Sequence, residues 1–218
     1  MPFNDLREFI ALLQDKKELL RVRKPVDIKF ELSAYIRKTS DRRGPAILFD
    51  NVKGFDFPVL GGVFATRERA FLALECTSQN YVEKFLSALE RLVPPRLVST
   101  GPCKDVIHKG KDVDLTLFPV PIFSEKDPGP FITLGLVISK DPETGRKNTS
   151  IYRLQVKGKN RLGIMAQQLL RQLSKAEAKG KGLPVAIVIG TDPVLALATQ
   201  WQAPYGTDEM ELAGALRG

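Results

Sequence analysis

Two residues of one short stretch, Asn148 and Arg153, have side chains suited to metal and acid chemistry. The Asn148 amide offers an uncharged oxygen, the kind of ligand that hard divalent cations accept. Arg153, five residues further on, carries a planar guanidinium that can hold a carboxylate or a phosphate with two parallel hydrogen bonds. One strand could therefore serve both a metal-bound cofactor and an acid substrate.

The residues around this pair have the period of a half-buried strand over 150–157, with Arg153 on the same face as Ile151. Asn148 comes before the regular alternation and after the turn-forming residues 141–145, so we expect it to project from the mouth of the strand. On spacing alone, a hairpin that carries a solvated arginine is the simpler alternative, since charged side chains are usually exposed.

Composition limits the class of protein. A chain of 218 residues with 43% hydrophobic content can form one large or two small domains around a real core. No apolar run approaches the roughly 18 residues of a membrane span, and the charged N-terminal residues argue against a signal peptide, so we expect a cytoplasmic protein. The net charge of +8 is scattered among acidic residues, which favours anionic ligands or an acidic partner segment over nucleic acid.

The cysteines and the single histidine carry little chemical signal. Cys76 and Cys103 lack the density of a disulfide scaffold and the paired spacing of a zinc site. His108 precedes a Lys-Gly-Lys turn, where a lone histidine is usually a surface residue.

The first half of the chain predicts a small α/β domain over residues 1–98. Asn4 or Asp5 can cap a first helix, and strand patterns follow at 20–26, 46–52 and 58–65. Residues 96–104 have no periodicity, and we place the domain boundary there.

The second half, residues 105–218, is rich in strand patterns. Prolines interrupt several of them, which suits a barrel better than a flat central sheet. The predicted strands lie at 106–109, 114–123, 131–139, 150–157 and 183–189, and the predicted helices at 167–179, 193–199 and after Thr207 or Asp208.

The segment 148–160, NTSIYRLQVKGKN, resembles the signature strand of the UbiD family of prenylated-flavin decarboxylases. Five further blocks resemble the family in the same order and extend the likeness over nearly the whole chain: 5–10, 44–49, 58–61, 183–186 and 213–216. The resemblance implies that the α/β domain precedes a flavin-reductase-like split β-barrel that binds the cofactor. In the family this barrel continues past the position of Gly218 and a third domain follows, so we expect a fragment or a chain that other chains complete.

The resemblance also implies a set of metal ligands. In the family a divalent cation, usually manganese, anchors the flavin phosphate and is held by an Asn, a His and a Glu, and potassium is a candidate second ion. Asn148 matches the Asn, and Glu209 takes the Glu position, with Glu211 as the weaker alternative. The His has no match, although Gln167 or Gln168 could offer an amide oxygen, or a water could fill its place.

For the flavin and the substrate, the resemblance assigns two segments. Ile151, Tyr152 and Arg153 would line the flavin, and Arg153 matches the arginine that orients the substrate carboxylate and the catalytic acid. Thr199, Gln200 and Trp201 would lie against the flavin phosphate and metal, although Trp201 is equally well explained as core packing. The family's acid lies beyond Gly218 and has no counterpart here.

These expectations describe a reversible carboxy-lyase acting on an aromatic or α,β-unsaturated carboxylic acid with prenylated FMN as electron sink. Its partners would be a small carboxylic acid, a flavin prenyltransferase that supplies the cofactor, and either further copies of itself or a completing chain. The alternative is a non-catalytic flavin-binding or accessory subunit that lacks the histidine and the acid. A third interpretation is a fragment that binds nothing, has disorder between Lys157 and Gln168, and associates through exposed apolar edges.

Overall fold

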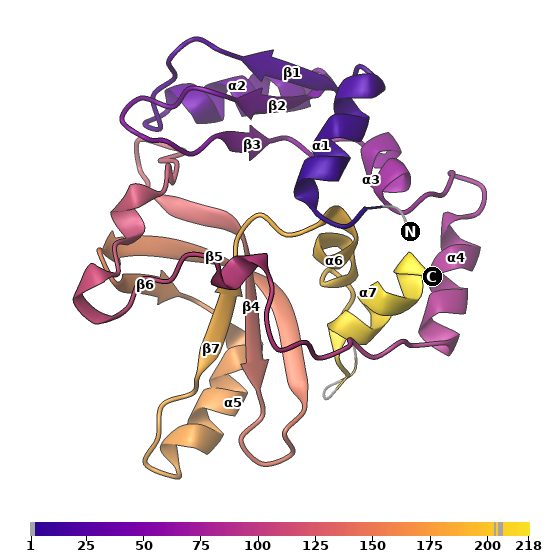
Figure 1. The fold of residues 1–218 in the computed structure, drawn as a ribbon, viewed down its shortest axis with the longest axis vertical. Coiled ribbons are helices and arrows are strands. Elements are labelled where there is room, and N and C mark those ends of the chain that lie inside the picture. The colour runs from indigo at the N-terminus through magenta and orange to yellow at the C-terminus, as the bar shows by residue number, and fades with distance from the viewer. Residues whose placement is uncertain (1–2, 203, 205–206) are drawn as a thin grey trace.

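The computed structural model describes residues 3–202, 204 and 207–218, and it contains two small sheets with helices around them (Figure 1). The first part of the chain forms α1 (Leu6–Asp15), β1 (Leu19–Val22), α2 (Glu31–Asp41), β2 (Ala46–Phe49), β3 (Val59–Gly61), α3 (Arg67–Ala73) and α4 (Tyr81–Glu90). The second part forms β4 (Phe131–Lys140), β5 (Lys147–Gly158), β6 (Arg161–Ile164), α5 (Gln167–Glu177), β7 (Val185–Val188), α6 (Pro193–Ala198) and α7 (Glu209–Arg217).

The first sheet has the order β1-β2-β3, with β1 and β2 parallel and β3 antiparallel to β2. Of the two predicted candidates, Asn4 and Asp5, it is Asp5 that caps α1, by accepting hydrogen bonds from the Arg7 and Glu8 backbone N–H groups. Arg69 of α3 is fully buried and donates to the backbone oxygens of Gly44, Gly62 and Val63 and to the Glu18 carboxylate. This guanidinium ties the loops around the sheet to α3, because each of its three nitrogens donates to an oxygen.

The second sheet is antiparallel, has the order β6-β5-β4-β7, and curls into a half barrel (Figure 1). α5 covers one face, where Leu169 packs with Leu154 of β5 in an apolar cluster. The mixed α/β class and the curled sheet agree with the prediction. The finer description as a flavin-reductase-like barrel stays a prediction.

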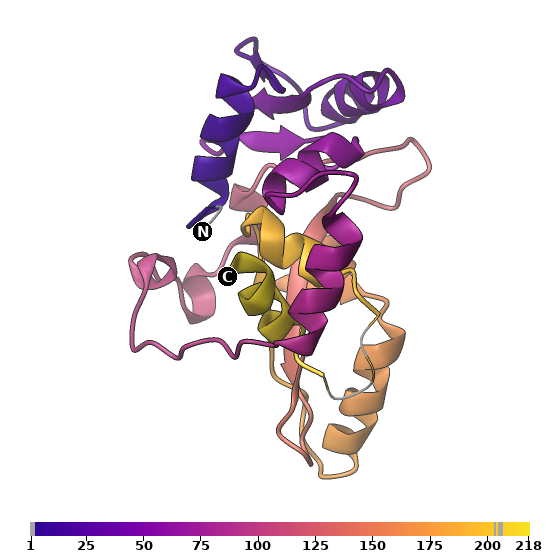
Figure 2. The same cartoon turned by 90° about the vertical axis from the view of Figure 1, so that its right-hand side faces the viewer.

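The predicted strands at 106–109 and 114–123 are wrong. This region instead forms short 3-10 turns, η1 (Pro102–Lys104), η2 (Gly110–Asp112) and η3 (Leu115–Leu117), and it extends away from the body between α4 and η3 (Figure 2). Pro119 and Pro121 lack the N–H groups that a strand ladder needs, and the segment keeps a single bridge, between Lys29 and Ile122. Among the described residues, no helix is long and apolar enough to cross a membrane.

Helices from both halves of the chain share one core. Ala88 of α4 packs in one buried cluster with residues of α6 and α7, including Val194, Leu212 and Ala213. The packing therefore crosses the predicted domain boundary, and the two proposed units 1–98 and 105–218 stay a prediction. By contrast, the stretch between Lys157 and Gln168, for which the fragment interpretation predicted disorder, forms the β5–β6 hairpin.

The close approach of α7 to the end of α4 requires a glycine. A Cβ built on Gly214 would overlap the backbone oxygen of Val93, which lies just after α4. The Val93 N–H also donates to the Glu211 backbone oxygen over 3.0 Å, so the two segments cannot separate freely.

We predict that Gly214→Ala lowers the free energy of unfolding by about 1–3 kcal/mol, because the added methyl group overpacks this contact. In an unhindered helix the same change would stabilise by about 1 kcal/mol through helix propensity, so the expected sign is opposite to the ordinary one. Urea unfolding measures the difference. Gly182→Ala, where a Cβ meets nothing within 4 Å, is the matched control. A Gly214→Ala protein at least as stable as the control would contradict the assignment.

Candidate functional site

Asn148 lies inside β5 and not before it. The strand begins at Lys147, and Asn148 is paired with Ser139 of β4, so the prediction that Asn148 projects from the strand's mouth is wrong. The hairpin continues the ladder to Lys140 and Lys147 because residues 141–145 form the tight turn. Since strand side chains alternate, Asn148 shares its face with Ser150 and Tyr152, and its Nδ2 lies 3.4 Å from Ser150 Oγ.

Glu209 occupies an edge of β5 that no strand covers. β6 pairs only with Leu154–Gly158, which leaves the beginning of β5 without a neighbour on that side in the described structure. Glu209 Oε2 accepts a hydrogen bond from the Thr149 backbone N–H at 2.7 Å, and Oε1 accepts one from Asn148 Nδ2 at 3.1 Å. The carboxylate thus satisfies a strand-edge donor and meets the Asn148 side chain at the same time.

The start of α7 holds Glu209 in this position. Of the two predicted candidates, Thr207 and Asp208, it is Asp208 that forms the N-cap, and its Oδ1 accepts a hydrogen bond from the Met210 N–H at 3.0 Å. Asp208 also reaches Lys147, with 3.7 Å between Oδ2 and Nζ. The helix N-terminus and the strand are therefore joined by two adjacent side chains, the N-cap Asp208 and Glu209, the first residue of α7.

The Glu209 carboxylate is 4% exposed, and its burial raises its pKa above the ordinary value. The hydrogen bonds from Thr149 and Asn148 act in the opposite direction but are outweighed by the loss of hydration. Burial likewise raises the pKa of the nearby Tyr152 hydroxyl. A divalent cation beside Glu209 would favour its ionised form, because opposite charge offsets the cost of burying a carboxylate.

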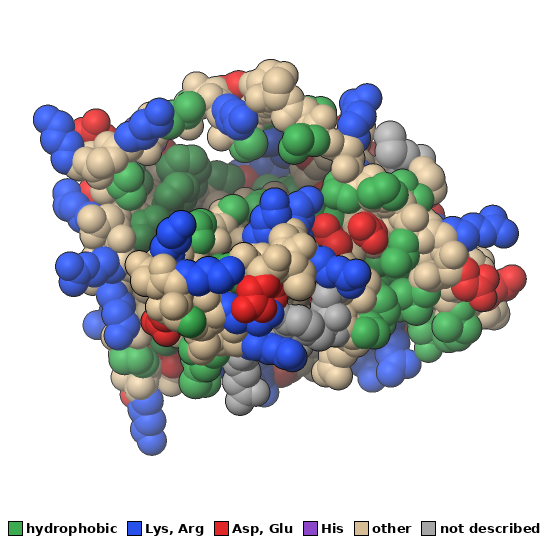
Figure 3. Space-filling view, turned by 90° about the horizontal axis from the view of Figure 1, so that it is seen from below, with side chains coloured by type: hydrophobic (Ala, Val, Ile, Leu, Met, Phe, Trp, Pro, Cys, Tyr) green, Lys and Arg blue, Asp and Glu red, His purple; other side chains and the backbone are tan. Residues whose placement is uncertain are grey.

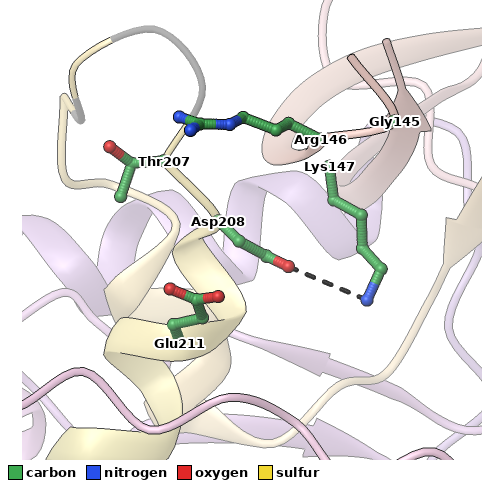
Figure 4. Close-up of a pocket in the computed structure, with 6 residues that line it drawn as sticks. All are labelled: Gly145, Arg146, Lys147, Thr207, Asp208 and Glu211. Atoms are coloured by element: carbon green, nitrogen blue, oxygen red, sulfur yellow. Dashed lines mark ion pairs between the residues drawn. The ribbon is translucent and has the colours of Figure 1, made fainter. Parts of the chain in front are cut away.

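A pocket of about 500 Å³ opens beside this pair (Figure 4). In Figure 4 the Lys147 ammonium points toward the Asp208 carboxylate, while Arg146 extends along the other side and Glu211 lies on α7. Gly145 and Thr207 complete the lining. Sequence reasoning missed Arg146 and Lys147, although two basic residues directly before Asn148 are a visible signal for an anion.

The surface around the sheet's lower end carries both signs of charge. Seen from below, Lys and Arg side chains are spread over this face, with acidic side chains among them (Figure 3). Such a mixture favours a small anionic group bound at one point over a long polyanion.

Arg153 is on the other face of β5 from Asn148. It lies five residues away, and its exposed guanidinium is 5.8 Å from the centre of the Phe131 ring. Ile151 pairs with Leu136, and Tyr152 with Gly135. The structure therefore brings Asn148 and Glu209 together and places Arg153 further along the strand, on its opposite face.

The remaining predicted residues lie around this centre in different settings. Thr199 ends α6, is buried, and donates its hydroxyl to the Ala196 backbone oxygen at 2.9 Å. Gln200 is exposed, and Trp201 packs against the α4–α6–α7 cluster, which agrees with the core-packing alternative. Gln167 and Gln168 begin α5, but their side chains lie outside the described part of the structure.

Cysteine and histidine are not gathered at this site. Cys76 and Cys103 are free thiols, and His108 is exposed between η1 and η2. Across the residues that the structure describes, no group of three or more His, Cys, Asp or Glu side chains could hold a metal. A cation bound at Asn148 and Glu209 would therefore have at most one further His, Cys, Asp or Glu ligand among the described residues.

Comparison with known proteins gives family matches over most of the chain. Residues 96–218 match the UbiD family, described as the 3-octaprenyl-4-hydroxybenzoate carboxy-lyase Rift-related domain, and residues 10–89 match the N-terminal domain of this carboxy-lyase.

Several solved structures are similar as well. An evolved dimeric form of the UbiD-class enzyme HmfF from Pelotomaculum thermopropionicum, in complex with prFMN, is 38% identical with a TM-score of 0.93. The match covers 98% of this chain and 50% of that one. The vanillic acid decarboxylase of Sedimentibacter hydroxybenzoicus in its closed form is 30% identical, with a TM-score of 0.93 and coverage of 99% and 48%.

The apo 3,4-dihydroxybenzoic acid decarboxylase of Klebsiella pneumoniae is 35% identical, with a TM-score of 0.90 and coverage of 99% and 49%. The chain thus spans about half the length of the solved structures that it matches.

We predict that Glu209→Gln changes how stability depends on pH in metal-free buffer. Because the folded-state pKa of Glu209 is raised, its contribution is fully present below the ordinary value of 4.5 and is lost as pH rises through the raised value. Relative to the variant, the wild-type protein should therefore be more stable near pH 4 than near pH 7. Denaturant unfolding of both proteins at each pH measures this double difference.

Glu211→Gln, which removes a charge from the same helix turn, is the control. If both variants change the pH dependence equally, the effect belongs to the charge of α7 as a whole and not to the buried Glu209 carboxylate.

Proposed function

The chain belongs to the UbiD family, and on this premise we propose that it forms the cofactor-binding part of a reversible carboxy-lyase. The proposed substrate is an aromatic or α,β-unsaturated carboxylic acid, and the proposed cofactors are prenylated FMN and a divalent cation such as manganese. The observation that carries the proposal is the contact of Asn148 with Glu209, two oxygen-bearing side chains that are 61 residues apart in sequence and 3.1 Å apart in space.

The matched relatives support the flavin. One HmfF structure contains prFMN and another contains FMN, and each covers 98% of this chain at 38% identity. Two further matched proteins are decarboxylases of aromatic acids by name. Both statements concern those proteins, and they come to this chain as part of the proposal.

The residues present fit a hard cation with an attached phosphate. Asn148 offers an amide oxygen once its amide is turned, and Glu209 offers a buried carboxylate, both suited to a manganese-like ion. Lys147 and Arg146 bring positive charge to the adjoining pocket, where a phosphate could lie. Asn148 and Glu209 would hold the metal, and the metal would fix the phosphate end of the flavin.

The open edge of β5 fits the flavin ring. The Thr149 N–H points away from β4 toward Glu209, so the Ile151 N–H, two residues on, points to the same edge. β6 begins its pairing only at Leu154, so in the described structure no strand competes for the Ile151 backbone. A planar ring with hydrogen-bonding oxygen and nitrogen atoms can use such an edge in place of a further strand.

When bound, prenylated FMN supplies the electron sink that makes loss of carbon dioxide feasible. The protein's own contribution is positioning. The Arg153 guanidinium can hold a planar carboxylate with two hydrogen bonds, and it does not give up its proton at any working pH. It would therefore fix the orientation of the substrate at the ring without acting as an acid.

The alternative function is a flavin-binding subunit without catalysis. Two observations favour it. Arg153 lies on the opposite strand face from Asn148, and among the described residues no group of three or more His, Cys, Asp or Glu side chains could hold a metal. Bound flavin without turnover of any acid in a panel of aromatic and α,β-unsaturated substrates would support this alternative.

We predict that Arg153→Ala, in protein loaded with prenylated FMN, lowers the rate of decarboxylation by at least about two orders of magnitude. The flavin absorbance spectrum should stay unchanged. Carbon dioxide release and product formation measure turnover, and the spectrum reports cofactor binding. Arg153→Lys should recover little activity, because an ammonium cannot reproduce the two-pronged grip on a carboxylate.

Arg161→Ala, an exposed arginine on β6, is the matched control and should keep full activity. Wild-type turnover by Arg153→Ala would refute the role of Arg153 as the carboxylate anchor.

A further inference from the structure

We propose that Phe131 is a positioning residue for Arg153. Its ring holds the guanidinium where a substrate carboxylate can meet it, and it occupies none of the guanidinium's hydrogen-bond donors. This role rests on the proposed function, in which Arg153 anchors the substrate carboxylate. Neither the sequence patterns nor the family resemblance gives Phe131 a part in the site.

Arg153 is exposed, and the Phe131 ring is its neighbour. Among the described residues, no carboxylate or backbone oxygen accepts a hydrogen bond from the guanidinium, which lies over the ring with 5.8 Å between Cζ and the ring centre. An exposed arginine without any partner samples many rotamers, and ordering it costs conformational entropy. A ring that attracts the guanidinium therefore reduces the number of orientations that a substrate must select.

An aromatic ring differs from a carboxylate as a partner for arginine. The ring attracts the guanidinium through the negative charge above its face, whereas a carboxylate accepts the N–H groups themselves. The five N–H groups lie in the plane of the guanidinium, so contact with a ring leaves them available to a substrate. A neighbouring Asp or Glu would also hold the side chain, but it would compete with the substrate for the same donors.

The β4–β5 ladder places the ring beside Arg153. Phe131 is paired with Gln155, and Arg153 lies two residues before Gln155 on the same face of β5. Phe131 and Arg153 are therefore diagonal neighbours, a spacing that long and aromatic side chains can bridge. The Phe131 N–H donates to the Pro121 oxygen at 3.0 Å, and Gln155 Nε2 donates to the Pro128 backbone oxygen at 3.0 Å. Both members of the pair are thus held by the preceding loop.

A β-bulge in β4 lies directly opposite Arg153. The register of the ladder shifts between Ile132 and Gly135. The two residues in between, Thr133 and Leu134, therefore oppose Arg153 alone, and both are exposed. Bulges are frequent beside active sites, where they increase the local twist and re-aim a side chain. The irregularity of β4 thus occurs at the position where the proposed anchor leaves the sheet.

The ladder resumes after the bulge only because residue 135 is a glycine. A Cβ built on Gly135 would lie 2.6 Å from Leu154 Cδ1, which is closer than two such carbon atoms approach. Leu154 is buried in the apolar cluster that includes Leu169 of α5, so it cannot move aside freely. The bulge opposite Arg153 is therefore fixed by the packing of the sheet.

The kinetic test compares two substitutions of Phe131 in protein loaded with prenylated FMN. Phe131→Leu keeps an apolar side chain but removes the ring, so kcat/KM should fall by about three- to thirtyfold, mainly through a higher KM. A purely structural defect would instead lower kcat by reducing the amount of folded enzyme, and melting temperatures check this. Phe131→Tyr keeps the ring and should stay within about twofold of wild type.

A second readout does not depend on turnover. In ¹⁵N-labelled protein, the NMR signal of the Arg153 Nε–H, identified by its loss in Arg153→Ala, should be displaced by the ring current of Phe131. The displacement should vanish in Phe131→Leu and persist in Phe131→Tyr. Benzoate, a simple aromatic carboxylate, should shift this signal with an affinity about three- to thirtyfold higher in wild type than in Phe131→Leu.

Phe57→Leu is the matched control. Phe57 is another exposed aromatic side chain, but its ring contacts Phe118 and not an arginine. Its KM and its benzoate affinity should equal those of wild type.

The proposal is overturned if the Arg153 signal is the same in wild type and Phe131→Leu, or if their benzoate affinities agree within about twofold. These measurements also separate the positioning role from the proposed function. If the flavin-loaded protein decarboxylates no acid while benzoate binding depends on the Phe131 ring, the function fails and the positioning role stands. If turnover is found while the signal and the benzoate affinity ignore Phe131, the function stands and the positioning role fails.

Discussion

The contact of Glu209 with β5 is the constraint on which the rest of the site depends. A strand edge carries donors that must be paired, and here a carboxylate takes the place that a neighbouring strand would fill. Hydrogen bonds from Thr149 and Asn148 partly offset the loss of hydration of that carboxylate. The loss of hydration is the larger effect, so the pKa of Glu209 is raised. The Glu209 carboxylate therefore has two roles. It pairs the donors at the edge of β5, and it is the group that we propose as a cation ligand.

Helix packing supplies the precision that this contact requires. α7 can present Glu209 to β5 only because its other face packs with α4 and α6, and because Gly214 lets it approach Val93. Arg217 secures the far end of α7 by donating to the Phe3 backbone oxygen and pairing with Asp192 at 2.7 Å. The geometry of the candidate metal site is thus set by the packing of α4, α6 and α7 as well as by the strand.

Local signals in the sequence predicted a good part of this arrangement. The sequence narrowed the caps of α1 and α7 to two adjacent residues each, Asn4 or Asp5 and Thr207 or Asp208, because short polar side chains before a helical period favour the N-cap position. The predicted position of Asn148 is wrong because the alternation of side chains is hard to read next to a turn. The predicted strand at 114–123 is wrong because Pro119 and Pro121 interrupt its apolar residues and cannot donate to a strand ladder. The packing of Leu169 with Leu154 depends on α5 lying over the sheet, a tertiary contact that no local pattern contains. The pairing of Asn148 with Glu209 came from family resemblance alone, since nothing in their spacing links them.

The separation of Asn148 and Glu209 by 61 residues has a consequence for biosynthesis. During translation the hairpin that carries Asn148 leaves the ribosome well before α7 is made. Any ligand that needs both side chains can be captured only after the later helix has emerged and docked. Cofactor acquisition would then have to wait until α7 has folded onto β5.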